Sequence, residues 1–102
     1  MTRVLYTVWF ELDPSVEAEW EKWMRSVHVP QVVRAGRFAG ARLYSVTEGG
    51  TFKHAVAYEA GDAATVKAYV EGPAKALRED YRKHFGGRSK LTRMTLEESF
   101  ST

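Results

Sequence analysis

The chain has 102 residues, no cysteine, 44% hydrophobic and 27% charged residues, and a formal net charge of +2. This length predicts one domain over residues 1–102, and the missing cysteines exclude disulfides and cysteine-ligated metal centres. The composition is not that of a disordered chain, and the sequence contains neither a signal peptide nor about 20 consecutive apolar residues, so we expect a cytoplasmic protein with no membrane partner.

The first half of the chain predicts a strand followed by a helix. Residues 3–12 alternate between two faces, both largely apolar, which is typical of a strand. Asp13-Pro14 then provides a capping side chain and a proline for the first turn of a helix. Its apolar positions recur at helical spacing up to Val27, and we expect this helix to end near His28, because Pro30 disfavours helical geometry in the residue before it.

The rest of the chain predicts three more strands and a second helix. Residues 39–47 and 51–60 are expected to pair as strands through a hairpin turn at Glu48-Gly49-Gly50. A helix follows Gly61-Asp62, with a kink at Gly72-Pro73, and ends at Gly86-Gly87. Residues 89–97 alternate again and form the last predicted strand.

The resulting order β-α-β-β-α-β predicts an α+β, ferredoxin-like fold, in which both helices lie on one face of a four-stranded antiparallel sheet. The other face would then expose one apolar side of the first strand, which we expect to be Leu5, Thr7 and Trp9. A second copy of the chain is the simplest cover for it. We therefore expect a homodimer, a dimeric α/β barrel with an apolar cavity between its two sheets, although the reverse assignment of the strand faces stays open.

A longer pattern resembles a known family. It runs Trp20-x-x-Trp23-Met24, His28-x-Pro30, Gly36-x-Phe38-x-Gly40-Ala41-Arg42, and continues more weakly through Tyr58, Tyr69, Ala76-Leu77-Arg78 and His84-Phe85-Gly86. The chain resembles a small uncharacterised bacterial family, a domain of unknown function, of the dimeric α/β-barrel superfamily. That superfamily includes cofactor-free monooxygenases, isomerases, polyketide cyclases and haem-degrading enzymes, so the resemblance implies a fold more firmly than a reaction.

His28 is the candidate catalytic residue. A histidine where the first helix reaches the mouth of the barrel could accept or donate a proton near neutral pH. From spacing alone it could equally cap the end of the helix. The H-x-P element of the resemblance favours a functional role.

Six further residues are candidates for binding a substrate. Trp9 would face the barrel, and Arg42 or Tyr44 could orient a carboxylate, enol or phenol, although Arg42 could also be a solvated edge residue. His54 and Tyr58 share a strand face, where His54 is more readily explained as a core histidine. Trp23, like Trp20, suits a core position better than a ligand platform.

Other partners fit poorly. The cluster of basic residues from Arg82 to Arg93 could hold an anionic ligand or nucleic acid, but a solvated helix end explains it more simply. The third strand lacks the stacking rings of an RNA-recognition motif, because Lys53 and Ala55 occupy their positions. The three histidines lack metal-binding spacing, so we expect no nucleic acid, no metal and no cofactor.

These observations favour a cofactor-independent enzyme acting on a hydrophobic, oxygenated small molecule such as a polyketide or aromatic intermediate. His28 would move a proton during a cyclisation, isomerisation or oxygenation, while Tyr44, Tyr58 or Arg42 holds the developing enolate or phenolate. A non-catalytic binding or accessory protein on the same dimeric scaffold is the alternative. It would leave His28 with a structural role only.

Overall fold

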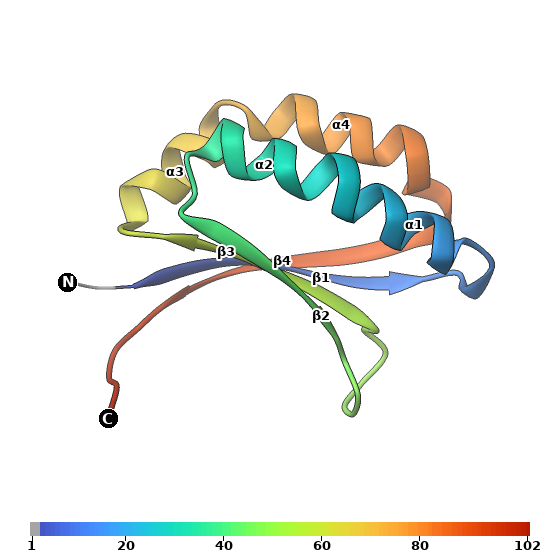
Figure 1. The fold of residues 1–102 in the computed structure, drawn as a ribbon, viewed down its shortest axis with the longest axis horizontal. Helices are drawn as coiled ribbons and strands as arrows, with labels where there is room; N and C mark the ends of the chain where they lie inside the picture. Colours follow the sequence, from blue (N-terminus) through green and yellow to red (C-terminus); the bar gives the residue numbers. More distant parts are fainter. Residues whose placement is uncertain (1–2) are drawn as a thin grey trace.

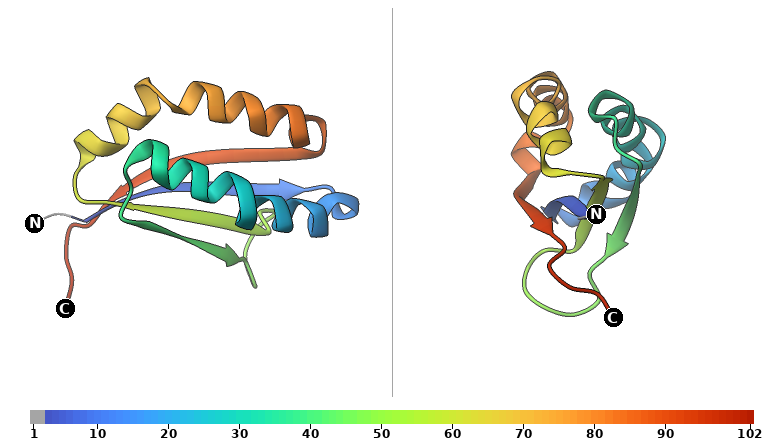
Figure 2. Two further views of the ribbon diagram at one scale, coloured as in Figure 1. Left: turned by 45° about the horizontal axis from the view of Figure 1, so that its top comes forward. Right: turned by 90° about the vertical axis from the view of Figure 1, so that its left-hand side faces the viewer.

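The computed structural model describes residues 3–102, which form one layer of helices over one sheet (Figure 1). The sheet is antiparallel, with the strand order β2-β3-β1-β4. Its strands are β1 (Val4–Leu12), β2 (Gly40–Ser45), β3 (His54–Ala60) and β4 (Ser89–Glu97). The helices all cover the same face, so the α+β, ferredoxin-like fold expected from the sequence is confirmed (Figure 2).

The helical segments begin where the sequence supplies caps. The first run consists of a 3₁₀ turn (Pro14–Val16), α1 (Glu17–Trp23), a π-helical turn (Met24–His28) and α2 (Val29–Gly36). The second consists of α3 (Ala63–Glu71), α4 (Ala74–Phe85) and a 3₁₀ turn (Gly86–Arg88). The carboxylates of Asp13 and Asp62 cap the two runs, accepting hydrogen bonds from the backbone N–H groups of Ser15 at 2.9 Å and Thr65 at 2.8 Å. The predicted break at Gly72-Pro73 separates α3 from α4.

The first helix does not end at His28, as the sequence suggested, but continues to Gly36 (Figure 1). The π-helical turn explains how the helix accommodates Pro30, because its wider ring removes the need for the hydrogen bond that proline cannot donate. In this turn the backbone N–H of Val29 donates to the carbonyl of Met24, five residues back. His28 is thereby buried, whereas Val27, expected in the apolar stripe, is 36% exposed.

Strands β2 and β3 are shorter than predicted, because the connection between them is a wide loop and not a tight hairpin. The backbone N–H of Val46 still donates to the carbonyl of Lys53 at 2.8 Å, which closes the base of the loop. Gly49 and Gly50 adopt φ values of 111° and 74°, a region that favours glycine, so the chain reverses at the predicted glycines. Strand β4 matches its predicted range.

Strand β1 separates the two faces of the sheet. Its even-numbered side chains lie under the helices, where Val4, Tyr6, Val8, Phe10 and Leu12 are all buried in the core. Leu5, Thr7 and Trp9 lie on the helix-free face, as expected, beside the exposed apolar side chains of Tyr44, Met94 and Leu96. We call this surface the open face; the β2–β3 loop and the C-terminal tail both bend toward it (Figure 1).

None of the helices in the described part of the chain is long and apolar enough to cross a membrane.

Candidate functional site

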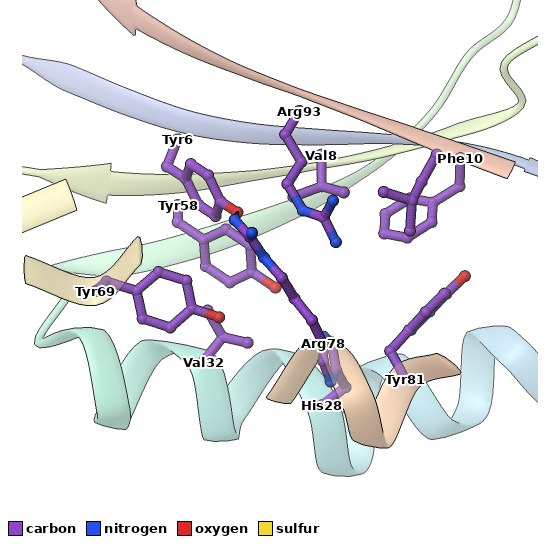
Figure 3. A pocket seen from close by; sticks show the side chains of 11 residues that line it. Tyr6, Val8, Phe10, His28, Val32, Tyr58, Tyr69, Arg78, Tyr81 and Arg93 are labelled. Atoms are coloured by element: carbon purple, nitrogen blue, oxygen red, sulfur yellow. Dashed lines mark hydrogen bonds between the residues drawn. The ribbon is translucent and has the colours of Figure 1, made fainter. Parts of the chain in front are cut away.

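A small hollow lies between the helices and the sheet, on the covered face (Figure 3). Its volume of about 20 Å³ is enough for roughly one water molecule. Apolar side chains and a group of titratable side chains surround it: Tyr6, Val8, Phe10, His28, Val32, Tyr58, Tyr69, Arg78, Tyr81, Leu91 and Arg93. We call this hollow the inner pocket. Polar groups are concentrated in a site that would otherwise be ordinary core.

The π-helical turn brings His28 into the inner pocket. Its imidazole stacks on Trp23, with ring centroids 5.0 Å apart, and packs against Tyr81 at 5.6 Å. The residue is 9% exposed, and its Nδ1 atom is buried with no hydrogen-bond partner. Burial lowers the pKa of His28 to about 4, helped by the charges of His84 and Arg93 and opposed by that of Asp80. At neutral pH the ring is therefore uncharged and able to accept a proton.

Three tyrosines form one side of the inner pocket. Tyr6 packs against Tyr58 and Tyr69, with ring centroids 5.9 Å and 5.7 Å apart. Burial, together with the neighbouring phenols, raises the pKa of Tyr58 far above its usual value and that of Tyr69 to about 12. The hydroxyls of Tyr58 and Tyr69 therefore stay protonated at neutral pH and can donate hydrogen bonds to a negatively charged oxygen.

This side is tightly packed near the end of α2. A Cβ atom on Gly36 would overlap the Phe38 ring and lie 3.0 Å from Cδ1 of Tyr69, so a side chain at this position would displace both rings. Phe38 in turn stacks on Tyr6, with their ring planes 4° from parallel. The glycine therefore helps to fix the tyrosine side of the pocket.

Two arginines complete the inner pocket. Arg78 extends from α4 and donates from Nη2 to the Tyr6 hydroxyl at 3.0 Å. Arg93 points inward from β4, opposite Val8 of β1 (Figure 3). Burial lowers the pKa of Arg93, and the positive charge of Arg78 lowers it further. Two like charges thus lie close together at one small hollow.

The sheet divides the seven residues proposed from the sequence into two groups. His28 and Tyr58 line the inner pocket, and Trp23 lies behind His28. Trp9, Arg42 and Tyr44 lie on the open face. The sequence-based interpretation placed Trp9, Arg42 and Tyr44 at the same barrel cavity as His28, but strand alternation prevents this, because these three side chains point to the opposite side of the sheet.

His54 lies on the covered face but outside the inner pocket. Its ring packs against Trp20, with centroids 4.8 Å apart, and its Nε2 atom lies 3.6 Å from Oε1 of Glu17. At 5% exposure it occupies the core position that the sequence favoured for it. Trp20 is also a core residue, and its indole N–H donates to the Tyr81 hydroxyl at 2.9 Å. Within residues 3–102, no three histidine, aspartate or glutamate side chains lie close enough together to hold a metal ion.

A second, wider hollow lies on the open face. It has a volume of about 270 Å³ and includes Arg42, Tyr44 and the ion pair of Arg3 with Glu59. Trp9 does not line it; its indole N–H donates to the Thr7 hydroxyl at 3.0 Å, so the ring lies along the strand. This hollow lacks the buried titratable groups that distinguish the inner pocket.

A family model matches residues 3–99 of this fold. The chain belongs to the family described as Domain of unknown function (DUF4286). This confirms the resemblance to an uncharacterised family that was inferred from the sequence. No curated protein is significantly similar to this DUF4286 chain in sequence.

Solved structures with low sequence identity share the fold of this DUF4286 protein. The haem degrader MhuD from Mycobacterium tuberculosis, solved with two haems in its active site, is 19% identical; the match covers 97% of this chain and 98% of MhuD with a TM-score of 0.71. An ethyl tert-butyl ether d (EthD) family protein from Bacillus halodurans is 17% identical, with 96% and 99% coverage and a TM-score of 0.70. A dimeric ferredoxin-like protein from an uncultured marine organism is 16% identical, with 99% and 97% coverage and a TM-score of 0.62.

Sequence reasoning about this DUF4286 chain did not identify the other polar residues of the inner pocket. Tyr6, Tyr69 and Tyr81 match apolar periodicities and were therefore indistinguishable from core. Arg78 carried a usable signal, because it lies four residues after Ala74 and three before Tyr81, within the apolar stripe of the second helical run. Arg93 carried another, since it alternates in phase with Leu91 on the covered face.

The buried neutral imidazole predicts a pH dependence of stability. An unfolded chain binds the proton of His28 near pH 6.5, whereas the folded DUF4286 protein binds it only near pH 4. The contribution of the uncharged His28 side chain to the free energy of unfolding is therefore complete above pH 6.5 and is lost as the pH falls toward 4. Between pH 7 and pH 5 we expect His28 to reduce the free energy of unfolding by about 2 kcal/mol.

Urea unfolding of the wild type and of His28→Gln at pH 7 and pH 5 measures this contribution. The other ionisable groups are the same in both proteins, so their contributions cancel in the comparison. We expect the free energy of unfolding of His28→Gln to fall by about 2 kcal/mol less than that of the wild type. An equal fall in both proteins would contradict the burial of a neutral His28.

Proposed function

We propose that the protein is a homodimeric enzyme that binds a hydrophobic, oxygenated small molecule in the inner pocket of each subunit. His28 removes a proton from an activated carbon or hydroxyl of the substrate, whose electron pair stays behind as an enolate or phenolate. This step is common to cyclisation, isomerisation and cofactor-free oxygenation. The observation that carries the proposal is the uncharged, buried imidazole of His28, with its unpaired Nδ1 atom, beside protonated tyrosine hydroxyls.

The inner pocket supplies an acceptor for the proton and donors for the resulting charge. Without a bound substrate, the buried imidazole of His28 has a pKa of about 4 and is therefore a weak base. A negative charge developing on the substrate would stabilise the imidazolium and raise this pKa during the reaction. The sequence offered three candidates for the donor to the oxyanion, namely Tyr44, Tyr58 and Arg42. We assign this role to Tyr58, because it alone of the three lines the same hollow as His28.

A substrate requires the inner pocket to open. Sites for molecules of drug size usually have volumes of about 300–1,000 Å³, whereas this hollow has about 20 Å³. Arg78 is half-buried and Arg93 exposed, and both are long flexible side chains at the edge of the hollow. We propose that their rotation admits the substrate. The proposed step needs no haem group.

The exposed apolar side chains of the open face support the proposed homodimer. Tyr44, Met94 and Leu96 are each 45–48% exposed there, and Trp9 and Leu5 are half-buried beside them. A second copy that packs its open face against this one would bury these side chains, and the marine ferredoxin-like protein of the same fold is dimeric. The inner pockets would then lie on the outer sides of the two sheets, one in each subunit.

Native mass spectrometry of the gently purified protein tests the proposed function. We expect the mass of a dimer of the 11.6 kDa chain carrying up to two copies of a small oxygenated molecule. The variant Leu91→Trp, which fills the inner pocket from β4, should lose this ligand, whereas Val70→Trp on the exposed side of α3 should keep it. Retention of the same ligand by Leu91→Trp would contradict binding in the inner pocket.

A further inference from the structure

Two arginines of the inner pocket have no acidic partner. Among residues 3–102, Arg3, Arg25 and Arg82 form ion pairs with glutamates, but no ion pair includes Arg78 or Arg93. The two side chains come from different elements, α4 and β4, and reach into the same space from its two sides (Figure 3). Neither the helix nor the strand by itself would bring them together.

The polar groups around the two guanidiniums are incompletely satisfied. The Nε atom of Arg78 is buried with no hydrogen-bond partner, although its Nη2 atom donates to Tyr6. The same hydroxyl of Tyr6 also interacts with Arg93. Unsatisfied donors and nearby like charges both destabilise a folded protein, and a bound anion at this hollow would relieve both. A negatively charged oxygen would pair with both guanidiniums and accept the free N–H groups.

We propose that the inner pocket selects a hydrophobic carboxylate, whose two oxygens are held by Arg78 and Arg93 while its apolar body packs against the tyrosine rings. This inference rests on the proposed function, because it names the substrate class of the same site. Planar guanidinium groups suit a carboxylate, since two parallel N–H donors match its two oxygens. The ring faces of Tyr58 and Tyr69 provide a flat apolar surface beside them.

A bound carboxylate would also act on His28. Its negative charge would offset the positive charge of Arg93, which disfavours protonation of the imidazole, and would add to the effect of Asp80. The other titratable groups beside this ring are His84 of α4, which stacks on Trp23, and Tyr81, which packs against the imidazole itself. The bound anion would therefore make His28 a stronger base in the complex than in the free protein.

Two probes of nearly the same shape separate charge from hydrophobicity. 2-Naphthoate carries a carboxylate, and 2-naphthamide replaces it with a neutral amide. Their dissociation constants can be measured by isothermal titration calorimetry at pH 7.5 with the full-length protein. We expect the wild type to bind 2-naphthoate about 10- to 100-fold more tightly than 2-naphthamide. This ratio of dissociation constants corresponds to the usual free energy of hydrogen bonds to charged groups.

Three variants assign this preference to the two arginines. Arg78→Gln and Arg93→Gln should each reduce affinity for 2-naphthoate while leaving affinity for 2-naphthamide nearly unchanged. Arg34→Gln removes the same charge from an exposed position on α2 outside the pocket and should keep the preference. Circular dichroism establishes that each variant is folded, and Arg93→Gln, on an exposed strand position, provides the test if Arg78→Gln is not.

The outcomes distinguish this inference from the proposed function. If the wild type binds the two probes equally, the carboxylate preference is overturned. If Leu91→Trp also loses both probes, the inner pocket is still the binding site of the proposed function. A preference that survives in Arg78→Gln and Arg93→Gln would also overturn it. Failure of the wild type to bind either probe at millimolar concentration would count against both the carboxylate preference and the pocket.

Discussion

The variant His28→Gln is expected to turn over the substrate about 10²–10⁴-fold more slowly than the wild type, the usual contribution of a general acid or base. The substrate for this measurement is the one identified from the retained ligand. Glutamine is similar in size to histidine, so the contacts with Trp23 and Tyr81 are largely kept, but its amide does not accept a proton near neutral pH. In steady-state kinetics, the plot of kcat/KM against pH for His28→Gln should also lack the acidic limb that the wild type shows.

The position of that limb follows from the burial of His28. For the wild type, kcat/KM should fall as the pH decreases through about 4, because the imidazole becomes protonated. A histidine with an unperturbed pKa would place the fall near pH 6.5. His84→Gln is the matched control, because His84 also stacks on Trp23, at 4.4 Å, but does not line the inner pocket. Full activity of His28→Gln would exclude it as the base and direct attention to His54 and the tyrosines.

The second large effect concerns assembly. The substitution Met94→Glu is expected to convert the dimer into a monomer at micromolar concentration. Met94 is 45% exposed on the open face and pairs across the strand with Thr7, whose hydroxyl donates to the Met94 carbonyl at 2.9 Å. A carboxylate here would be buried in each copy of a symmetric interface, and each unpaired charge costs several kcal/mol. The dissociation constant should therefore rise by at least about 10³-fold.

Sedimentation equilibrium measures this change. Val70→Glu places the same charge at a 40% exposed apolar position on α3, away from the open face, and should leave the dimer intact. A wild-type protein that sediments as a monomer would contradict the proposed dimer. A Met94→Glu variant that remains dimeric would show that the copies associate through another surface.

The fold was predictable because its signals are local. Alternation along β1 and β4, the caps at Asp13 and Asp62, and the break at Gly72-Pro73 each depend on residues within a few positions of one another. The same local reasoning failed where hydrogen bonding departs from the common patterns. The steric rule for the residue before proline predicts the end of a helix near His28, but Val29 keeps helical geometry, with φ −59° and ψ −47°, directly after the π-helical turn.

The candidate site was only partly predictable, because it depends on which side of the sheet each residue occupies and on contacts between distant segments. His28 and Tyr58 were identified, but Arg78 meets Tyr6 across 72 positions in the sequence. The sequence-based interpretation placed Trp9 and Arg42 at the same cavity as His28, but alternation combined with the strand register puts them on the opposite face from Tyr58. The missing step was to combine the strand register with the position of the helices.

The π-helical turn also sets the winding of the whole first helical rod. Its buried positions recur every four residues, at Val16, Trp20, Met24, His28, Val32 and Gly36. In a straight α-helix, with about 100° per residue, a stripe of this period would drift by about 200° over those 20 residues, from the sheet toward solvent. Under-winding at Met24–His28 compensates for part of this drift. Without this turn, Trp20 and Val32, which are 12 positions apart, would lie about 120° apart around a straight α-helix and could not face the sheet together.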